Sequence, residues 1–230
     1  MDEYERRLAR YEAAATPCGQ IALEEGGLID FFSPFGPMIA RLRAPISLVE
    51  SINGYMDRRI EAHEGPGGAQ REAERLGHFS LGEEFLREGG DGSVASLTAR
   101  WIARYLGFTD DRELSRVRFE NFWMVRHFAG TFSPVHFHSG DISGVLYLKV
   151  PTSIANEHEE ERRSYISARR AGYITFLIGG KQRFSKSLIS FKPVVGDFYI
   201  FPGWLLHAVE PFVGSGERRS MSFNAFVDSA

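Results

Sequence analysis

The chain has 230 residues, of which 43% are hydrophobic and 13% are aromatic. This composition can build a sizeable core, which excludes a chain that is disordered throughout. The net charge is −3 with acidic and basic residues interspersed, so no basic stripe of the kind that binds nucleic acid is present. The single cysteine, Cys18, excludes an internal disulfide and a Cys-rich zinc site, and it indicates a reducing compartment.

Residues 1–15 are charged throughout, and no apolar run approaches the roughly 18 residues of a membrane span. We therefore expect no targeting segment, no membrane partner and a cytoplasmic location. Residues 2–15 have apolar residues at helical spacing and predict a short amphipathic arm. This arm would be long enough to reach a second copy of the chain, so a homodimer is left open.

Two longer helices are predicted in the first half of the chain. The apolar stripe of the first consists of Leu48, Val49, Ile52, Tyr55, Met56 and Ile60. The second runs from about residue 93 to 106, where Gly107 should end it. A single short strand is predicted at residues 38–40.

From Arg118 onward the sequence changes to short runs rich in Phe, Val, Ile and Tyr, separated by turn signals. Alternation in the last run puts two sets of side chains on opposite faces. The apolar set is Met221, Phe223, Ala225 and Val227; the polar set is Arg218, Ser220, Ser222 and Asn224. The polar face would be either half solvated or the lining of an internal cavity.

The pattern therefore predicts one α+β domain over residues 1–230. Residues 1–115 would form a mostly helical part that packs on a β core at residues 116–230, and this core would carry the functional site.

The chemistry is indicated by His136 and His138, which are two residues apart and would point to the same face of an extended segment. Taken alone, they could be two surface histidines on an edge strand. His207 follows an aromatic strand and turn, and it could be a hydrogen-bonded core histidine. If all three bind one ion, they leave its other side open; imidazole suits Fe, Zn, Cu and Ni, and open positions are what oxygen chemistry requires. The first hypothesis is therefore a redox metalloenzyme.

Arg218 lies eleven residues beyond His207. It could be a surface cation beside Glu217 and Arg219. Its guanidinium fork would equally suit a bidentate clamp on a carboxylate.

Residues from about 120 to 228 resemble the Fe(II)- and 2-oxoglutarate-dependent oxygenases, in particular a bacterial branch of that superfamily. The motifs that carry the resemblance are His136-x-His138, Ser143–Tyr147, Phe201–His207 and Arg218–Asn224. The resemblance implies a mainly β fold with flanking helices, a double-stranded β-helix or cupin-like jelly roll, with iron at its open end.

The resemblance also implies roles for individual residues. His136 matches the first family histidine and His207 the distal one. Arg218 matches the arginine that pairs with the far carboxylate of 2-oxoglutarate, and Tyr147 stands where many relatives offer a phenol to the same carboxylate. The implied reaction is a dioxygenase reaction that oxidises an unknown small molecule or peptide while 2-oxoglutarate is converted to succinate and CO2.

The sequence departs from the family at His138, where most members have an aspartate or glutamate. A neutral imidazole there leaves bound iron with one more unit of positive charge. Asp141 is the alternative ligand, but three residues from His138 it faces the other way on a regular strand, so we favour His138. The remaining histidines, His63, His78, His127 and His158, have no spacing that indicates ligation and are interpreted as structural or exposed.

Two other functions are consistent with part of the pattern. Gly196, Pro202 and His207 approximate a cupin signature, so a three-histidine cupin that does not use 2-oxoglutarate is the first alternative. It would leave Arg218 without a purpose. The second alternative is a non-catalytic jelly-roll binding module.

Overall fold

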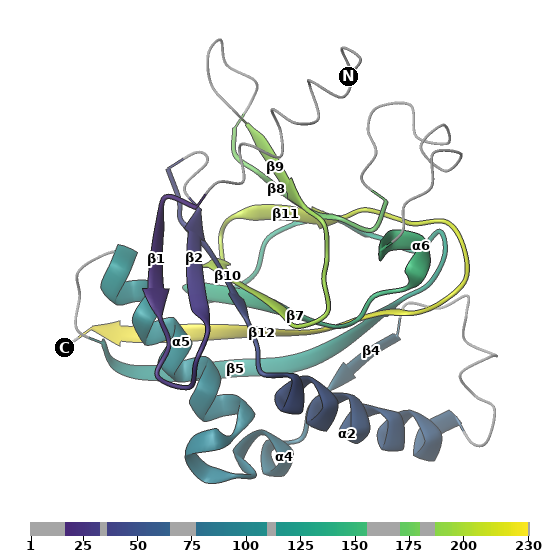
Figure 1. The fold of residues 1–230 in the computed structure, drawn as a ribbon, viewed down its shortest axis with the longest axis horizontal. Coiled ribbons are helices and arrows are strands. Elements are labelled where there is room, and N and C mark those ends of the chain that lie inside the picture. The colour runs from purple at the N-terminus through teal and green to yellow at the C-terminus, as the bar shows by residue number, and fades with distance from the viewer. Residues whose placement is uncertain are drawn as a thin grey trace.

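The computed structural model describes residues 17–32, 36–64, 77–109, 114–155, 171–179 and 187–229, which form two antiparallel sheets that face each other (Figure 1). The larger sheet has the order β1-β2-β3-β10-β7-β12-β5-β4, and the smaller has the order β6-β11-β8-β9. The strands are β1 Gly19–Ala22, β2 Leu28–Phe32, β3 Ile39–Arg43, β4 Gly77–Ser80, β5 Leu114–His127, β6 Ser133–His136, β7 Ile142–Lys149, β8 Ile174–Leu177, β9 Leu188–Phe191, β10 Asp197–Pro202, β11 Leu206–Val209 and β12 Arg218–Ser229. The predicted arm at residues 2–15 lies outside the described residues.

From β5 onward the chain passes back and forth between the two sheets. β5, β7, β10 and β12 belong to the larger sheet, whereas β6, β8, β9 and β11 belong to the smaller one. This winding is that of a jelly roll, so the predicted fold class is confirmed. Its consequence for function is that residues far apart in sequence meet between the sheets.

The first half contributes more strands than the sequence indicated. β3 corresponds to the predicted strand, but β1 and β2 extend the sheet beyond it, and β4 pairs with β5 at the opposite edge. The prediction missed β1, β2 and β4. These are short segments at or near the sheet edges, with no long apolar alternation, and pairing with a preformed neighbour stabilises them.

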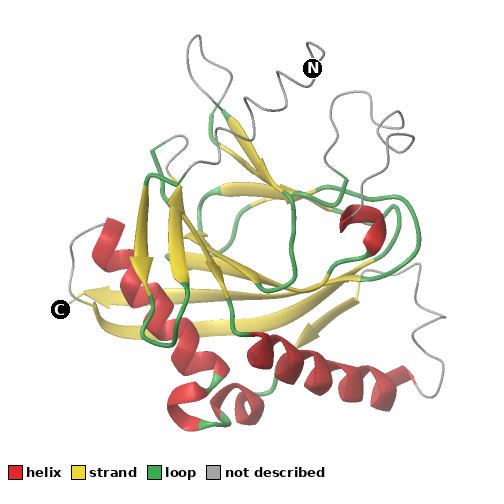
Figure 2. Cartoon of the chain, viewed as in Figure 1, coloured by secondary structure: helices red, strands yellow, loops and turns green. Residues whose placement is uncertain are grey.

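Three helices cover one side of the larger sheet, away from the smaller sheet (Figure 2). They are α2 Ile46–Glu64, α4 Glu83–Arg87 and α5 Val94–Thr109, and a short helix, α6, spans Thr152–Ala155. The two long helices are confirmed, but α5 continues through Gly107 where the sequence predicted its end. The ring of Phe108 stacks on Phe31 with 4.0 Å between centroids, and this tertiary contact helps to hold the last turn in place.

The described residues form two main hydrophobic clusters, one on each face of the larger sheet. The first lies between the helices and the sheet and includes Met221, Phe223 and Ala225 of β12. The second lies between the two sheets and includes Tyr147, Phe176 and Phe201. The space between the sheets is therefore partly filled by apolar side chains, and some of these also line a cavity.

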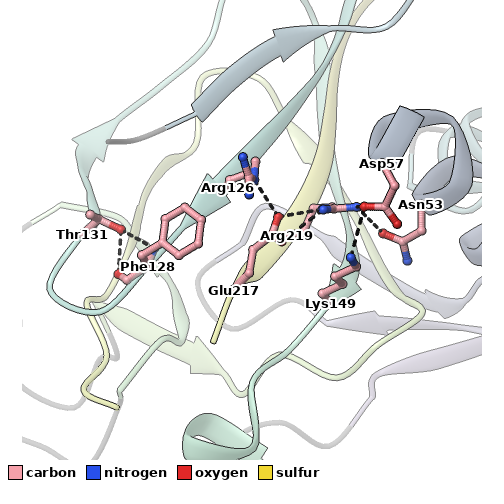
Figure 3. A network of polar contacts seen from close by, with 8 residues as sticks. All are labelled: Asn53, Asp57, Arg126, Phe128, Thr131, Lys149, Glu217 and Arg219. Carbon is pink, nitrogen blue, oxygen red and sulfur yellow. Dashed lines mark hydrogen bonds and ion pairs between the residues drawn. The ribbon is translucent and has the colours of Figure 1, made fainter. Parts of the chain in front are cut away.

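An ion-pair network joins α2 to the sheet (Figure 3). The Glu217 carboxylate accepts hydrogen bonds from Arg126 at 2.9 Å and from Arg219 at 2.7 Å, and Arg219 also donates to Asp57 of α2 at 2.7 Å. Burial raises the pKa of Glu217, but the hydrogen bonds and charges of the two arginines outweigh it and hold this pKa below its usual value. The network fixes Arg219 on the face of β12 opposite to Arg218.

No helix in the described ranges combines the length and the apolar character that a membrane crossing requires.

Candidate functional site

Three imidazoles meet between the sheets. His136 ends β6 and is the register partner of His207 in β11, while His138 follows β6 by two residues. Their ligand nitrogens all lie within 4.8 Å of one another, and the Nε2 atoms of His138 and His207 are 3.2 Å apart. The ring centroids are separated by 4.3 to 5.0 Å. The convergence that the sequence predicted is found.

Backbone carbonyls orient two of these rings. Nδ1 of His136 lies 2.6 Å from the Pro134 carbonyl oxygen, and Nδ1 of His207 lies 2.9 Å from that of Leu205. A ring that donates its Nδ1–H to a carbonyl carries a lone pair on Nε2, the form that binds a metal. Both rings are therefore held with the correct nitrogen facing the cluster.

The surroundings keep the imidazoles of His138 and His207 neutral. Burial lowers the pKa of His207 to about 3, with smaller contributions from His136 and His138, although the contact to Leu205 opposes the shift. Burial also lowers the pKa of His138 to about 4, together with the charge of His136. Neutral imidazole is the form that a metal requires, so neither of these two rings has to lose a proton at neutral pH.

The turn that carries His138 is fixed to the turn that precedes His207. The amide of His138 donates to the carbonyl of Gly203, and the amide of Gly203 donates to the carbonyl of Asp141, both at 2.9 Å. A Cβ on Gly203 would come to 2.4 Å from the carbonyl oxygen of Gly140, so only glycine permits this approach. The close approach of two turns therefore positions His138 next to His207.

Asp141 points elsewhere. Its carboxylate accepts a hydrogen bond from the amide of Val227 at 3.0 Å, and it does not belong to the group of ligand atoms that the described residues bring together. The geometry thus groups His138, rather than Asp141, with His136 and His207.

A cavity of about 420 Å³ lies beside the three histidines. It is lined by the polar set of β12, namely Arg218, Ser220, Ser222 and Asn224, together with residues of β5, β7 and the smaller sheet. The apolar set of the same strand packs toward the helices. The predicted alternation is confirmed, and the structure decides the open question in favour of a cavity lining rather than a solvated face.

The cavity has a closed end and an open end. Arg218 and Tyr147, each 1% exposed, line the closed end. Six residues further along β12, Asn224 pairs with Asn121, which is exposed and lines the open end. The ring of His138 lies 5.4 Å from that of Trp123, a residue that pairs with Ser222. The histidine cluster thus lies between the closed end and the solvent.

The closed end contains donors without acceptors. Nη1 of Arg218 donates to the carbonyls of Gly172 and Glu210, at 2.7 and 3.2 Å. Among the described residues, four buried side chains have a polar atom without a hydrogen-bond partner, and three of these line this cavity: Arg218 at Nη2, Tyr147 at its hydroxyl and His127 at Nδ1. Such atoms cost free energy unless they are paired, so the closed end fits an anionic group with several acceptor oxygens.

Burial explains the electrostatics of this end. It lowers the pKa of Arg218 to about 10 and raises that of Tyr147 to about 12. At neutral pH the guanidinium still carries its charge and the phenol still carries its proton. Both groups can therefore donate to a carboxylate.

His127 was interpreted from the sequence as structural or exposed, and the structure places it at the closed end of the cavity. It ends β5 and is the register partner of Arg218. Its spacing relative to the other histidines gives no signal, and only the pairing of β5 with β12 shows where it lies. The side chains of His63 and His78, and all of His158, are outside the described residues.

The comparisons with known proteins agree with this geometry. Residues 121–224 match the family described as "Putative 2OG-Fe(II) oxygenase". HygX from Streptomyces hygroscopicus, solved with nickel and 2-oxoglutarate, is similar with a TM-score of 0.52 and 12% identity, over 80% of this chain and 81% of that chain. No curated protein sequence matches the chain.

Two prolyl hydroxylases are also similar. The prolyl-4-hydroxylase of Pseudomonas putida has a TM-score of 0.48 and 16% identity, over 81% of this chain and 91% of that chain. The viral collagen prolyl hydroxylase of Paramecium bursaria Chlorella virus-1 has a TM-score of 0.48 and 15% identity, over 81% and 94%. The β core, from residue 121 to 224, is thus similar to the Fe(II)- and 2-oxoglutarate-dependent oxygenases.

Proposed function

We propose that His136, His138 and His207 bind Fe(II), and that Arg218 and Tyr147 bind the far carboxylate of 2-oxoglutarate. The observation that carries the proposal is the shared cavity, which is lined by a cluster of three imidazoles and, deeper, by a buried cation and a phenol with unpaired polar atoms. When bound together, iron and 2-oxoglutarate supply an O2-dependent oxidation that is coupled to formation of succinate and CO2.

The residues of the chain would bind the metal and the co-substrate, orient them and shield them from bulk water. The paired rings of His136 and His207 fix the metal site to the smaller sheet, because both belong to neighbouring strands. Arg218 supplies the positive charge that selects a dicarboxylate, and its contacts to Gly172 and Glu210 hold the fork in place. Ile174 and Phe201 line the cavity near the cluster, and these apolar walls keep bulk water out.

The three-histidine set changes the charge of the site. With no carboxylate among the ligands, a divalent ion keeps both of its positive charges, whereas a two-histidine, one-carboxylate set would neutralise one of them. An anionic co-substrate is therefore favoured more strongly than with two histidines and one carboxylate.

The substrate, a small molecule or a peptide, would enter at the open end beside Asn121 and Trp123. We also propose a reducing, cytoplasmic location, which the single cysteine supports.

The test uses purified protein loaded with Fe(II) without oxygen. Addition of 2-oxoglutarate should produce a metal-to-ligand charge-transfer band, and admission of O2 should yield succinate. A cupin that does not use 2-oxoglutarate would bind metal without the band, and a binding module would show neither result. Either outcome would refute the proposal.

The ligand set is tested by metal content. His207→Ala and His138→Ala should lose iron, whereas Asp141→Ala should keep it, because the Asp141 carboxylate contacts the backbone of Val227. Phe137→Ala is the matched control, since Phe137 lies between the two histidines and is 66% exposed. Loss of iron only in the Asp141 variant would overturn the assignment.

A further inference from the structure

We infer that His127 is a third donor to the far carboxylate of 2-oxoglutarate, held in the donating form by Ser133, and that it sharpens selection of a dicarboxylate. The inference rests on the proposed function, because it assumes that 2-oxoglutarate occupies this cavity. It adds a co-substrate-binding residue that neither the histidine spacing nor the family motifs assign.

The geometry of His127 supports this role. It is 2% exposed and ends β5 directly opposite Arg218 of β12. It lines the cavity together with Arg218 and Tyr147, and its Nδ1 atom is buried without a hydrogen-bond partner. Three side chains that line one cavity therefore each have a buried polar atom without a partner.

The contact of His127 to Ser133 is compatible with a proton on Nδ1. Its hydroxyl lies 3.0 Å from Nε2 of His127, and a hydroxyl can donate to a ring nitrogen. If Ser133 donates to Nε2, the single proton of the neutral ring is on Nδ1, the atom without a partner. The opposite tautomer would present a lone pair to a carboxylate, which is unfavourable.

The ring is neutral beside the cation. Burial, with the positive charge of Arg218, lowers the pKa of His127 to about 3. A neutral donor can add a hydrogen bond to the carboxylate without repelling the guanidinium. Together with Arg218 and Tyr147, this gives three donors from three neighbouring strands of the larger sheet, β5, β12 and β7.

Three substitutions of His127 separate the roles of its two ring nitrogens. His127→Leu removes both ring nitrogens and keeps an apolar side chain. In His127→Asn the amide group reaches the position of Nδ1, whereas in His127→Gln it reaches the position of Nε2. If the Nδ1–H is the functional donor, Asn should retain more of the affinity than Gln or Leu, although Leu fills the space.

The experiment titrates Fe(II)-loaded protein anaerobically with 2-oxoglutarate and with 2-oxopentanoate, which has the same chain length but lacks the far carboxylate. Loss of one hydrogen bond to a charged group corresponds to about ten- to hundred-fold in affinity. We expect His127→Leu to lose this much affinity for 2-oxoglutarate, His127→Asn to lose less than fivefold, and neither variant to change the binding of 2-oxopentanoate. Iron content should stay equal to that of the wild type.

Two results would overturn the inference while leaving the proposed function intact: equal weakening of both ligands, which indicates a packing role, or unchanged binding of both. If the wild type itself gives no charge-transfer band with 2-oxoglutarate, the proposed function fails and this inference fails with it. If His127→Leu does not fold, the comparison of Asn with Gln still decides, since a result in which Gln retains more affinity than Asn contradicts donation from Nδ1.

Discussion

Replacement of Arg218 by methionine should separate co-substrate binding from stability. Burial lowers the pKa of this guanidinium from 12.5 to about 10, and at about 1.4 kcal/mol per pKa unit the charge costs about 3 kcal/mol in the unliganded protein. Methionine removes this cost but leaves the carbonyls of Gly172 and Glu210 without their donor, at about 1–3 kcal/mol each. The opposing contributions should leave the free energy of unfolding within about 3 kcal/mol of the wild type.

The effect on 2-oxoglutarate should be much larger. Removing the cation from a buried charged pair costs about 2–5 kcal/mol, so the affinity should fall at least about thirtyfold while iron remains bound. The charge-transfer band under anaerobic titration measures the affinity directly. Arg118→Met is the matched control, because Arg118 lies in the same sheet but is paired with Asp228 at the surface.

Thermal unfolding gives an independent readout. At a hundredfold excess over its dissociation constant, 2-oxoglutarate should stabilise the metal-loaded wild type by about 2.7 kcal/mol, and the same concentration should have little effect on the Arg218 variant. Retention of wild-type affinity in Arg218→Met, or loss of iron from it, would refute the assignment of the closed end to the far carboxylate.

Three further predictions concern stability. Glu217→Gln should lower the free energy of unfolding by about 3 kcal/mol, because two buried arginines lose their shared carboxylate; an unchanged urea midpoint would contradict this. Gly144→Ala should lower the free energy of unfolding by about 1–3 kcal/mol or more, since the added Cβ would meet Phe223 at 2.3 Å and the carbonyl oxygen of Tyr199 at 2.6 Å. A variant with the melting temperature of the wild type would show that the strands can move apart at no cost. The imidazole of His127 takes up a proton below about pH 6.5 in the unfolded chain but only near pH 3 in the folded protein. The stability that the folded protein gains from a neutral ring is therefore fully present above pH 6.5 and is lost as the pH falls. Between pH 7 and pH 5 the metal-free wild type should therefore lose about 2 kcal/mol more stability than His127→Asn, and equal losses in urea titrations would argue against a buried neutral ring.

The sequence predicted most of the β core and the residues that cluster at the proposed metal site, because these have local signatures. The period-two alternation of β12 identified its two faces before any partner strand was known. The spacing of His136 and His138, and the aromatic turn before His207, marked the three imidazoles. Arg218 and Tyr147 were indicated by the family motifs in which they stand.

The structure was needed wherever strands far apart in the chain meet. β1, β2 and β4 have little pattern of their own and exist because a neighbouring strand pairs with them. Likewise, α5 passes through Gly107, where the local rule predicted an end, and Phe108 packs on Phe31 at its last turn.

At the site, local patterns identify the side chains that are available, and long-range contacts select which of them meet. The contact of the 138–141 turn with Gly203 brings His138 to His207 and directs Asp141 to Val227. The register of β5 with β12 places His127 opposite Arg218. Local periodicity specifies the face on which a residue lies, but contact across a cavity depends on long-range strand register and on the close approach of loops, which no local pattern encodes.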